Sequence, residues 1–342
     1  MIIQARAPLR LGMAGGGTDV SPYCDKYGGY VLNASIDRYA YTVIKTLEQP
    51  IVKFAATDLN IEVHNELLPY FELDGILDLH KAVYNHIIKN YNNGVPISME
   101  VSTFCDAPIG SGLGASSTLV VSMIRAFIEF LNLSLDDYSI AHLAYQIERV
   151  DCKFSGGRQD QYSAVFGGFN FMEFYDDNRA IITPLRVKNW ILNELEASLV
   201  IFYVGVSRES SKIITDQSNN VKKGSIKAIN AMHGIKNEAF SMKECLLRGD
   251  FPGMVESMKL GWENKKKSAE TVSNSHIDEI FNKAIKAGAL AGKISGAGGG
   301  GFILFFVKIE CRMNVISALS QYEGQVSNCH FTKNGAQAWR IA

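Results

Sequence analysis

The chain has 342 residues, of which 47% are hydrophobic and 20% are charged. This composition excludes intrinsic disorder and indicates a globular protein of two domains or one large domain, with enough chain for a substantial apolar core. Its 34 basic and 35 acidic residues give a formal net charge of −1. A charge so close to zero excludes a general attraction to nucleic acid or to an anionic membrane, so an anionic ligand would need a local basic pocket.

Neither a membrane span nor a secretory leader is expected. No apolar run reaches the roughly 18–20 residues that cross a bilayer, and the first residues, Met1 to Arg6, lack the pattern of a signal peptide. The six cysteines are scattered without a Cys-x-x-Cys pair, which favours reduced packing residues over a zinc site or disulfides. These features predict a cytoplasmic protein.

The opening third of the chain predicts mostly strands. Residues 2–11 are strand-like, interrupted by Pro8, and run into a loop at 12–19 with three consecutive glycines. Alternating apolar and polar residues, many of them β-branched or aromatic, predict further strands, at residues 30–45, 51–56, 60–63 and 97–103. Apolar residues at helical spacing predict a helix over 80–90, which ends near the turn signal Asn92-Asn93-Gly94.

Two consecutive helices are predicted in the middle of the chain, after a glycine-rich turn. Residues 119–131 carry apolar side chains at the spacing of a buried helix face. Ser134, followed three residues later by Asp137, is typical of an N-cap and predicts the start of a second helix. Its inward-facing residues are expected to be Ile140, Ala144, Ile147 and Val150. Gly156-Gly157 breaks this helix.

The rest of the chain mixes strands and helices. Strands are expected at 169–174, 198–204 and 302–307, and helices at 226–248 and 277–287. A composition shift at residues 176–187 is the best candidate for a domain boundary. Because neither half alternates strictly between strand and helix, we predict an α+β fold with two domains, residues 1–185 and 186–342.

Three glycine-rich loops, at residues 12–19, 108–117 and 293–301, are the strongest functional signal. Glycine costs backbone entropy, so clusters of it usually serve turns or the close approach of another group. The central loop lies between a predicted strand and a predicted helix, where free amides and the positive end of the helix dipole can bind a phosphate. The alternative is an ordinary tight turn capped by Ser116.

Two common phosphate motifs do not fit the central loop. Gly110, Gly112 and Ala115 satisfy the loose dinucleotide pattern G-x-G-x-x-A. A second helix follows, however, where that motif requires a strand with a terminal acid, which argues against a hydride-transfer enzyme. The Walker pattern fails because no Gly-Lys-Ser/Thr follows the glycines.

Together the three loops resemble the signatures of the GHMP small-molecule kinases, a family that includes galactokinase and the homoserine, mevalonate and phosphomevalonate kinases. The central loop is similar to the signature that binds the ATP phosphates, from which Ala115 and Ser117 depart. Residues 293–301 resemble the third signature, which packs against the phosphate loop, and residues 7–11 and 15–19 resemble the first, which contributes to the acceptor site. This resemblance implies an N-terminal mixed α/β domain and a C-terminal ferredoxin-like α+β domain. It also implies ATP binding by Pro108, Gly110, Ser111, Gly112, Leu113, Gly114, Ala115, Ser116 and Ser117.

The same resemblance implies a magnesium site and a general base. Mg²⁺ prefers hard oxygen ligands and keeps several waters, so the hydroxyl of Ser116 and the carboxylate of Glu148 suffice. Asp160, expected on a loop, aligns with the general base of galactokinase-like and mevalonate-kinase-like members, and Arg10 is expected to orient it or to contact the transferring phosphate. Read alone, Glu148 is a solvated acid at a helix end and Asp160 is a turn-forming aspartate.

The first signature also narrows the acceptor. Residues 15–19, with Tyr23 and residues 28–37, resemble the family branch that phosphorylates heptose phosphates, to which fucokinase domains are similar. The branch implies that ATP phosphorylates the anomeric hydroxyl of D-glycero-D-manno-heptose 7-phosphate, a small-molecule sugar phosphate. It further implies that Gly16, Gly17, Thr18 and Asp19 bind the sugar. The alternative for Thr18 and Asp19 is an Asx-type turn.

A phosphorylated acceptor needs cations for its existing phosphate. Arg158 and Arg208 rank first because both lie in short polar segments that read as loops. The other candidates are Arg149, Lys153 and the run Lys265-Lys266-Lys267, although a triple lysine usually marks a solvated helix face.

Two alternatives to a heptose phosphate kinase stay open. One is a kinase for a neutral sugar such as L-fucose, which would lack a basic pocket at the sugar site. The other is a nucleotide-binding relative without turnover, against which the joint presence of Ser116, Glu148 and Asp160 argues. The sequence does not indicate an oligomeric state.

Overall fold

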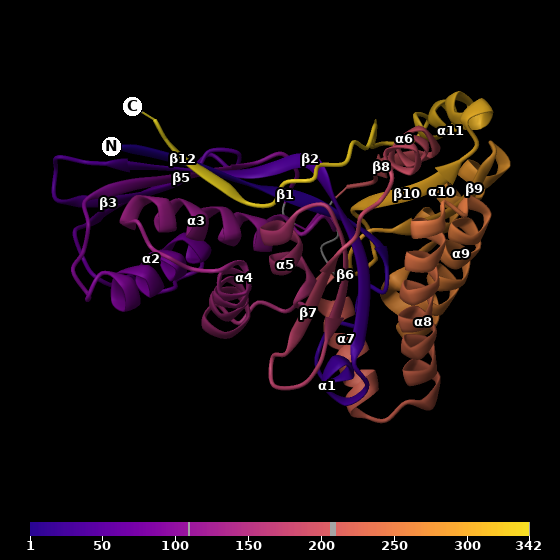
Figure 1. Ribbon diagram of the computed structural model, residues 1–342, viewed down its shortest axis with the longest axis horizontal. Coiled ribbons are helices and arrows are strands. Elements are labelled where there is room, and N and C mark those ends of the chain that lie inside the picture. Colours follow the sequence, from indigo (N-terminus) through magenta and orange to yellow (C-terminus); the bar gives the residue numbers. More distant parts are fainter. Residues whose placement is uncertain (109, 206–209, 342) are drawn as a thin grey trace.

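Two sheets organise the computed structural model, which describes residues 1–108, 110–205 and 210–341 (Figure 1). The larger sheet has the order β12-β1-β2-β5-β3-β4, with β6 paired to β2 and β7 to β6. Its strands are β1 (Ile2–Ala14), β2 (Gly29–Thr46), β3 (Ile51–Ala56), β4 (Ile61–Glu66), β5 (Met99–Cys105), β6 (Phe169–Phe174), β7 (Ala180–Pro184) and β12 (Gln337–Ile341). Only β3 and β5 pair in parallel among the described strands.

The smaller sheet has the order β11-β8-β10-β9. Its strands are β8 (Leu199–Tyr203), β9 (Ala289–Ile294), β10 (Phe302–Val307) and β11 (Gln325–Ser327). Numbered along the chain from β8, this antiparallel order is 4-1-3-2, with helices between β8 and β9 and between β10 and β11. That is the ferredoxin-like arrangement expected for the second part of the chain.

Helices cover both sheets (Figure 1). Those before residue 200 are α1 (Tyr23–Tyr27), α2 (Asp78–Tyr91), α3 (Ala115–Leu131), α4 (Asp137–Tyr145), the π-helix η1 (Gln146–Asp151), α5 (Gln159–Phe166) and α6 (Asn189–Ser198). Those after it are α7 (Ser210–Lys222), α8 (Ile226–Arg248), α9 (Phe251–Ser268), the 3₁₀ turn η2 (Glu270–Val272), α10 (Ser275–Lys286), the 3₁₀ turn η3 (Ile309–Cys311) and α11 (Arg312–Leu319).

The continuous apolar run of β10 is explained by burial on both faces. Phe302, Leu304 and Phe306 pack into the main core, which extends over the larger sheet. The alternate residues, Ile303 and Phe305 among them, pack into a second core under α10 and α11. A strand buried on both faces loses the alternation of apolar and polar residues that a half-exposed strand shows.

The predicted start of the second helix was wrong by two residues. Asp136, not Ser134, is the N-cap of α4, and its carboxylate accepts from the amide of Ser139. The helix then passes into η1, and this change of helical period turns Val150 outward, where it is 50% exposed instead of buried. Ile140 and Ile147 are buried as expected.

The last strand returns to the first part of the chain. β12 pairs antiparallel with β1, from Ile2 opposite Ile341 to Arg6 opposite Gln337, and Figure 1 shows both termini on the same side of the molecule. The proposed division at residue 185 falls between β7 and α6. The larger sheet therefore takes one edge strand from beyond that division.

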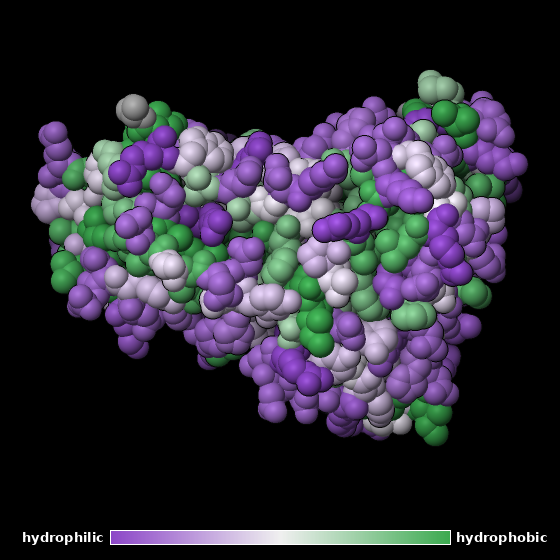
Figure 2. Space-filling model, viewed as in Figure 1, coloured by the Kyte–Doolittle hydropathy of each residue, from purple (hydrophilic) through white to green (hydrophobic). Residues whose placement is uncertain are grey.

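The surface is largely hydrophilic and the cysteines are unpaired, in agreement with the interpretation of the composition. Hydrophilic side chains cover most of the face in Figure 2, with hydrophobic ones scattered between them. In the part of the chain that the structure describes, no helix has both the length and the apolar character to span a membrane. All six cysteines are free thiols, and burial raises the pKa of Cys24 to about 12.

Candidate active site

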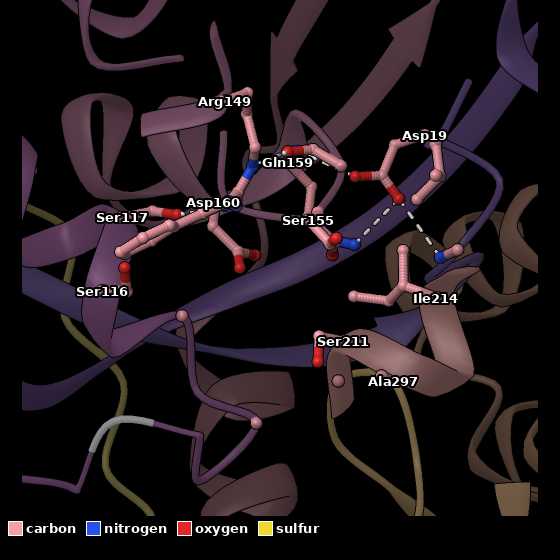
Figure 3. Close-up of a pocket in the computed structure, with 18 of the residues that line it drawn as sticks. Asp19, Ser116, Ser117, Arg149, Ser155, Gln159, Asp160, Ser211, Ile214 and Ala297 are labelled. Atoms are coloured by element: carbon pink, nitrogen blue, oxygen red, sulfur yellow. Dashed lines mark hydrogen bonds between the residues drawn. The ribbon is translucent and has the colours of Figure 1, made fainter. Parts of the chain in front are cut away.

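One cavity of about 540 Å³ collects residues from all three glycine-rich loops. Figure 3 shows Ser116 and Ser117 on one side of it, Asp19 on the other and Asp160 between them. Ser211 and Ala297 lie along a further wall. The charged side chains in the lining are the acids Asp19, Glu148 and Asp160 and the bases Arg10, Arg149, Lys153 and Lys265.

The central loop presents the start of α3 to this cavity. α3 begins after Gly114, whose φ of 79° is left-handed, and no described side chain caps it. The amides of its first turn therefore remain free for an anion at the positive end of the helix dipole. Ser116 does not cap the helix, because its hydroxyl donates to Glu148 at 2.6 Å. The interpretation of this loop as a turn capped by Ser116 was wrong.

The predicted ATP-binding residues divide into two groups. Those that line the cavity are Gly110, Gly112, Gly114, Ala115, Ser116 and Ser117. Pro108 is exposed outside the lining, whereas Ser111 and Leu113 are fully buried. Ser111 accepts from the amide of Phe302 through its carbonyl, and Leu113 accepts from the amide of Arg10. These two residues hold the loop in place and are not in the lining of the cavity.

The third glycine-rich loop packs directly on the central one. The Ser295 hydroxyl donates to the carbonyl of Gly112 at 2.9 Å. A side chain on Gly112 would overlap the carbonyl of Ser295, and one on Gly296 would lie 2.8 Å from the Cα of Gly112. Both positions need glycine because two backbones touch there. The packing predicted for these two motifs is confirmed.

Glu148 joins the serines at the start of α3. It is 1% exposed in η1, the π-helical turn that continues α4. Its Oε1 accepts from Ser116 and its Oε2 from Ser117, both at 2.6 Å, and Nη1 of Arg149 lies 3.0 Å from Oε1. Gln161 donates to Oε2 at 2.7 Å. Glu148 is therefore not the solvated acid of the alternative interpretation, and π-helical turns within helices are frequent at functional sites.

Arg10 connects Asp160 to the central glycine-rich loop. Nε and Nη2 of Arg10 lie 2.7 and 2.6 Å from Oδ1 of Asp160, and Nη1 donates to the carbonyl of Gly112 at 2.6 Å. Asp160 lies in the first turn of α5, not on a loop as expected, and its side chain is 19% exposed. Its Oδ2 lies beside Gly114, where an added Cβ would be 3.3 Å away. The carboxylate thus faces the start of α3.

Thr18 is an internal residue of the first loop. It is fully buried, and its hydroxyl lies 2.8 Å from the carbonyl oxygens of both Gly15 and Tyr30. The carbonyl of Gly16 is also occupied, by Lys265. The structure therefore gives Thr18 and the Gly16 carbonyl contacts that hold the loop, and neither residue is in the lining of the main cavity, whereas Gly17 lines it.

Asp19 lines the cavity and fastens the first loop to α5. Oδ2 accepts from the backbone amides of Arg158 and Gln159 at 2.9 and 3.0 Å. Oδ1 accepts from Nε2 of Gln159 at 3.0 Å and from the amide of Gly17 at 3.1 Å. A carboxylate at a helix N-terminus is favoured by the helix dipole. A side chain on Gly157 would overlap this carboxylate, so glycine is needed there.

Of the two arginines ranked first for an acceptor phosphate, Arg158 does not line this cavity. Arg158 is 3% exposed, and its Nη2 donates to Oδ1 of Asp25 at 2.9 Å. It lines a smaller cavity beside the main one. Arg208 lies outside the described residues. Arg149 and Lys153, which ranked lower, do line the main cavity.

Lys265, which the sequence named only as a lower-ranked cation in a triple-lysine run, is buried in the wall of the cavity. Its Nζ donates to the carbonyls of Gly16 at 2.9 Å and Gly296 at 2.8 Å, so it joins the first and third loops. Burial lowers its pKa to about 8, while Asp19 opposes this shift and Arg10 adds to it. The prediction of a solvated triple lysine was wrong here. Helical spacing provides the missing signal, because Lys265 follows Met258 and Trp262 by seven and three residues on the buried face of α9.

Sequence comparisons identify the family models and relatives that this chain matches. The sequence model of the GHMP kinases N terminal domain matches residues 78–168, and that of the GHMP kinases C terminal domain matches residues 242–320. The D-glycero-alpha-D-manno-heptose 7-phosphate kinase of Campylobacter jejuni subsp. jejuni serotype O:2 is 47% identical over 339 residues, which cover 99% of each chain.

Solved structures show the same arrangement. A D-glycero-D-manno-heptose 1-phosphate kinase from Bacteroides thetaiotaomicron is 42% identical over 99% of both chains, with a TM-score of 0.85. The galactokinase of Lactococcus lactis, solved with galactose, has a TM-score of 0.77 over 98% of this chain and 95% of its own. At 17% identity, this second likeness concerns the fold alone.

Proposed function

The chain belongs to the GHMP kinase family, and on this premise we propose that it transfers a phosphoryl group from ATP to the anomeric hydroxyl of D-glycero-D-manno-heptose 7-phosphate. The product is the 1,7-bisphosphate. Family membership makes ATP the phosphoryl donor. The 47% identity to a heptose 7-phosphate kinase along nearly the whole chain supports the acceptor. The use of ATP in sugar metabolism favours the cytoplasm as its compartment.

The observation that carries the proposal is the Arg10–Asp160 pair beside the start of α3. Both contacts from Arg10 fall on Oδ1 of Asp160, while Oδ2 lies next to Gly114. An acceptor hydroxyl placed between Oδ2 and a phosphate bound on the α3 amides would have a base on one side and the γ-phosphate on the other. Phosphoryl transfer depends mainly on such positioning and on electrostatic stabilisation.

The proposed transfer forms one bond to phosphorus, breaks another and moves one proton. The anomeric oxygen forms a bond to the γ-phosphorus while the bond from that phosphorus to the β,γ-bridging oxygen breaks. The proton of the hydroxyl passes to Oδ2 of Asp160, and ADP leaves with the bridging oxygen. The amides at the start of α3 are available to bind the charge on the phosphates, and Arg10 keeps Asp160 oriented.

The residues at Glu148 fit a magnesium ion. Mg²⁺ takes oxygen ligands and is usually held by one or two carboxylates together with phosphates and waters. Glu148 and the Ser116 hydroxyl provide a buried carboxylate and a hydroxyl 2.6 Å apart on the cavity wall. Such an ion would neutralise charge on the β- and γ-phosphates. No cluster of three His, Cys, Asp or Glu side chains occurs in the described residues, so the phosphates and waters would complete its shell.

The proposal is tested by an ADP-release assay with Mg-ATP and three acceptors at equal concentration. These are D-glycero-D-manno-heptose 7-phosphate, the unphosphorylated heptose and L-fucose. A strong preference in kcat/KM for the 7-phosphate supports the proposal. Comparable or faster turnover of a neutral sugar would overturn the assignment of the acceptor, and no turnover with any of them would favour a nucleotide-binding relative without activity.

A further inference from the structure

A second cavity of about 300 Å³ adjoins the main one at the sugar end. The two share lining residues of the first loop and of the segment before α5, including Asp19, Arg149 and Gly156. No described residue of the phosphate loop lines the second cavity. We call it the side cavity. Because it lies beside Asp19 and away from the start of α3, it suits a part of the acceptor and not of ATP.

The side cavity is basic. Its lining includes Arg149, Arg158 and Lys222 against the single carboxylate of Asp19, all among the described residues. The two oxygens of Asp19 already accept four N–H donors. Lys222, the last residue of α7, is exposed and has no ion-pair partner in the described part of the chain. Arg149 and Arg158 pair with Glu148 and Asp25, which lie outside this lining, so the positive charge that the described residues leave without a partner is that of Lys222.

Arg158 lines this cavity and carries a side-chain donor without a partner among the described residues. The side chain is 3% exposed, and its Nη1 is buried without a hydrogen-bond partner among the described residues. Its Nη2 is held by Asp25, and the ring of Phe174 lies 5.8 Å from the guanidinium carbon. These contacts fix the guanidinium in place. A buried polar group without a partner is rare in native proteins and points to a ligand or an ordered water.

We propose that the side cavity is the subsite for the phosphate that the acceptor already carries. This inference rests on the proposed function. Arg158 and Lys222 supply the charged donors. Thr215 and Ser218 line the same cavity, but their hydroxyls donate to the carbonyls of Ser211 and Ser21. A phosphate dianion accepts hydrogen bonds from arginine forks and lysine ammonium groups, whereas a neutral sugar would leave these charges without a partner. The subsite thus selects phosphorylated over unphosphorylated acceptors.

Charge reversal at two neighbouring lysines tests this subsite. Lys222→Glu changes the side cavity, and Lys223→Glu is the matched control, because Lys223 is also exposed and lines a different cavity. KM values are measured for D-glycero-D-manno-heptose 7-phosphate, the unphosphorylated heptose and Mg-ATP. A hydrogen bond to a charged group is worth roughly 1.5–3 kcal/mol, so we expect Lys222→Glu to raise the KM for the 7-phosphate about tenfold or more. The other two KM values, and all three in Lys223→Glu, should stay within about twofold.

Arg158→Lys provides a second measurement, since it keeps the charge but removes the planar fork. We expect a higher KM for the 7-phosphate with an unchanged KM for Mg-ATP, while a thermal melt checks that the variant is folded. If the wild-type enzyme prefers the 7-phosphate and both lysine variants behave alike, the subsite is wrong while the proposed function stands. If the wild-type enzyme shows no preference for the 7-phosphate, the proposed function fails and the subsite fails with it.

Discussion

At the scale of single residues, the proposed chemistry requires a general base, and the position of Asp160 fits that role. Arg10 occupies one carboxylate oxygen and leaves the other facing Gly114. Asp160→Ala should lower kcat by roughly 10²–10⁴, which is typical of losing general-base assistance, while the Kd of Mg-ATP changes little. Single-turnover kinetics and nucleotide titration measure the two effects. Near-normal turnover in the variant would exclude the base role.

Lys265 predicts a pH dependence for the proposed acceptor site. Its pKa is lowered from 10.5 to about 8, so the ammonium that binds Gly16 and Gly296 loses its charge as the pH rises through that value. The charges of Asp19, which raises this pKa, and Arg10, which lowers it, act on Lys265, and Lys265 in turn lowers the pKa of the neighbouring Lys293. Because the neutral amine holds the two loops less firmly, we expect the acceptor KM to increase several-fold between pH 7 and pH 9.

Global stability cannot produce this increase. The unfolded chain binds more protons than the folded one between the two pKa values, so the contribution of Lys265 to the free energy of unfolding rises with pH. The measurement is the acceptor KM from pH 6.5 to pH 9.5 in the wild type, in Lys265→Met and in the exposed control Lys267→Met. The increase should vanish in Lys265→Met alone. Its persistence there would assign the titration to another group.

The limits of sequence interpretation are clearest at this scale. The glycine spacing and the family resemblance predicted Ser116, Glu148 and Asp160, which the structure brings to one cavity. They did not predict that Thr18 turns inward, because a hydroxyl that binds a sugar and one that binds a backbone carbonyl look alike in sequence. Lys265 was named only as part of a triple-lysine run, although its helical spacing from Met258 and Trp262 indicates the buried face of α9.

At the scale of elements, the π-helical turn η1 carries the proposed magnesium ligand. It places Glu148 so that both oxygens meet hydroxyls from the first turn of α3. Glu148→Gln removes the charge but keeps the shape, so we expect the Mg²⁺ concentration for half-maximal activity to rise about tenfold or more. Glu263→Gln on the exposed face of α9 is the control. A magnesium titration that is unchanged in Glu148→Gln would place the ion elsewhere.

Elements were predictable where one local rule governs them. The β10 strand and the α8 helix follow directly from apolar runs and helical spacing. The end of α4 was not predictable, because the change to a π-helix is set by the contacts of Glu148 with α3 and by no local pattern. β12 was also missed, since a short, largely exposed strand at a sheet edge has little apolar content to reveal it.

At the scale of the whole molecule, residues from the end of the chain complete both the site and the larger sheet. Lys293 of β9 donates to the carbonyls of Gly12 and Met13 at the end of β1, at 2.7 and 3.2 Å. β12 pairs with the beginning of the same strand. β1 is therefore fastened at both ends by later segments, with Arg10 between them.

Removal of residues 337–342 tests how much β12 contributes. The five residue pairs between β12 and β1 imply several backbone hydrogen bonds of about 0.5–1.5 kcal/mol each, so we expect the Tm to fall by roughly 5–10 °C. Activity at 25 °C should persist, because β12 pairs with residues 2–6 and Arg10 lies beyond them, bonded to Asp160 and Gly112.

Thermal melts and kcat of the shortened chain separate the outcomes of this truncation. A lower Tm with normal kcat means that β12 stabilises the sheet without shaping the site. An unchanged Tm would show that the edge pairing contributes nothing to stability. Loss of kcat in a chain that is still folded at 25 °C would show that strain at the start of β1 reaches Arg10, and the position of Asp160 would then depend on the pairing of the two termini.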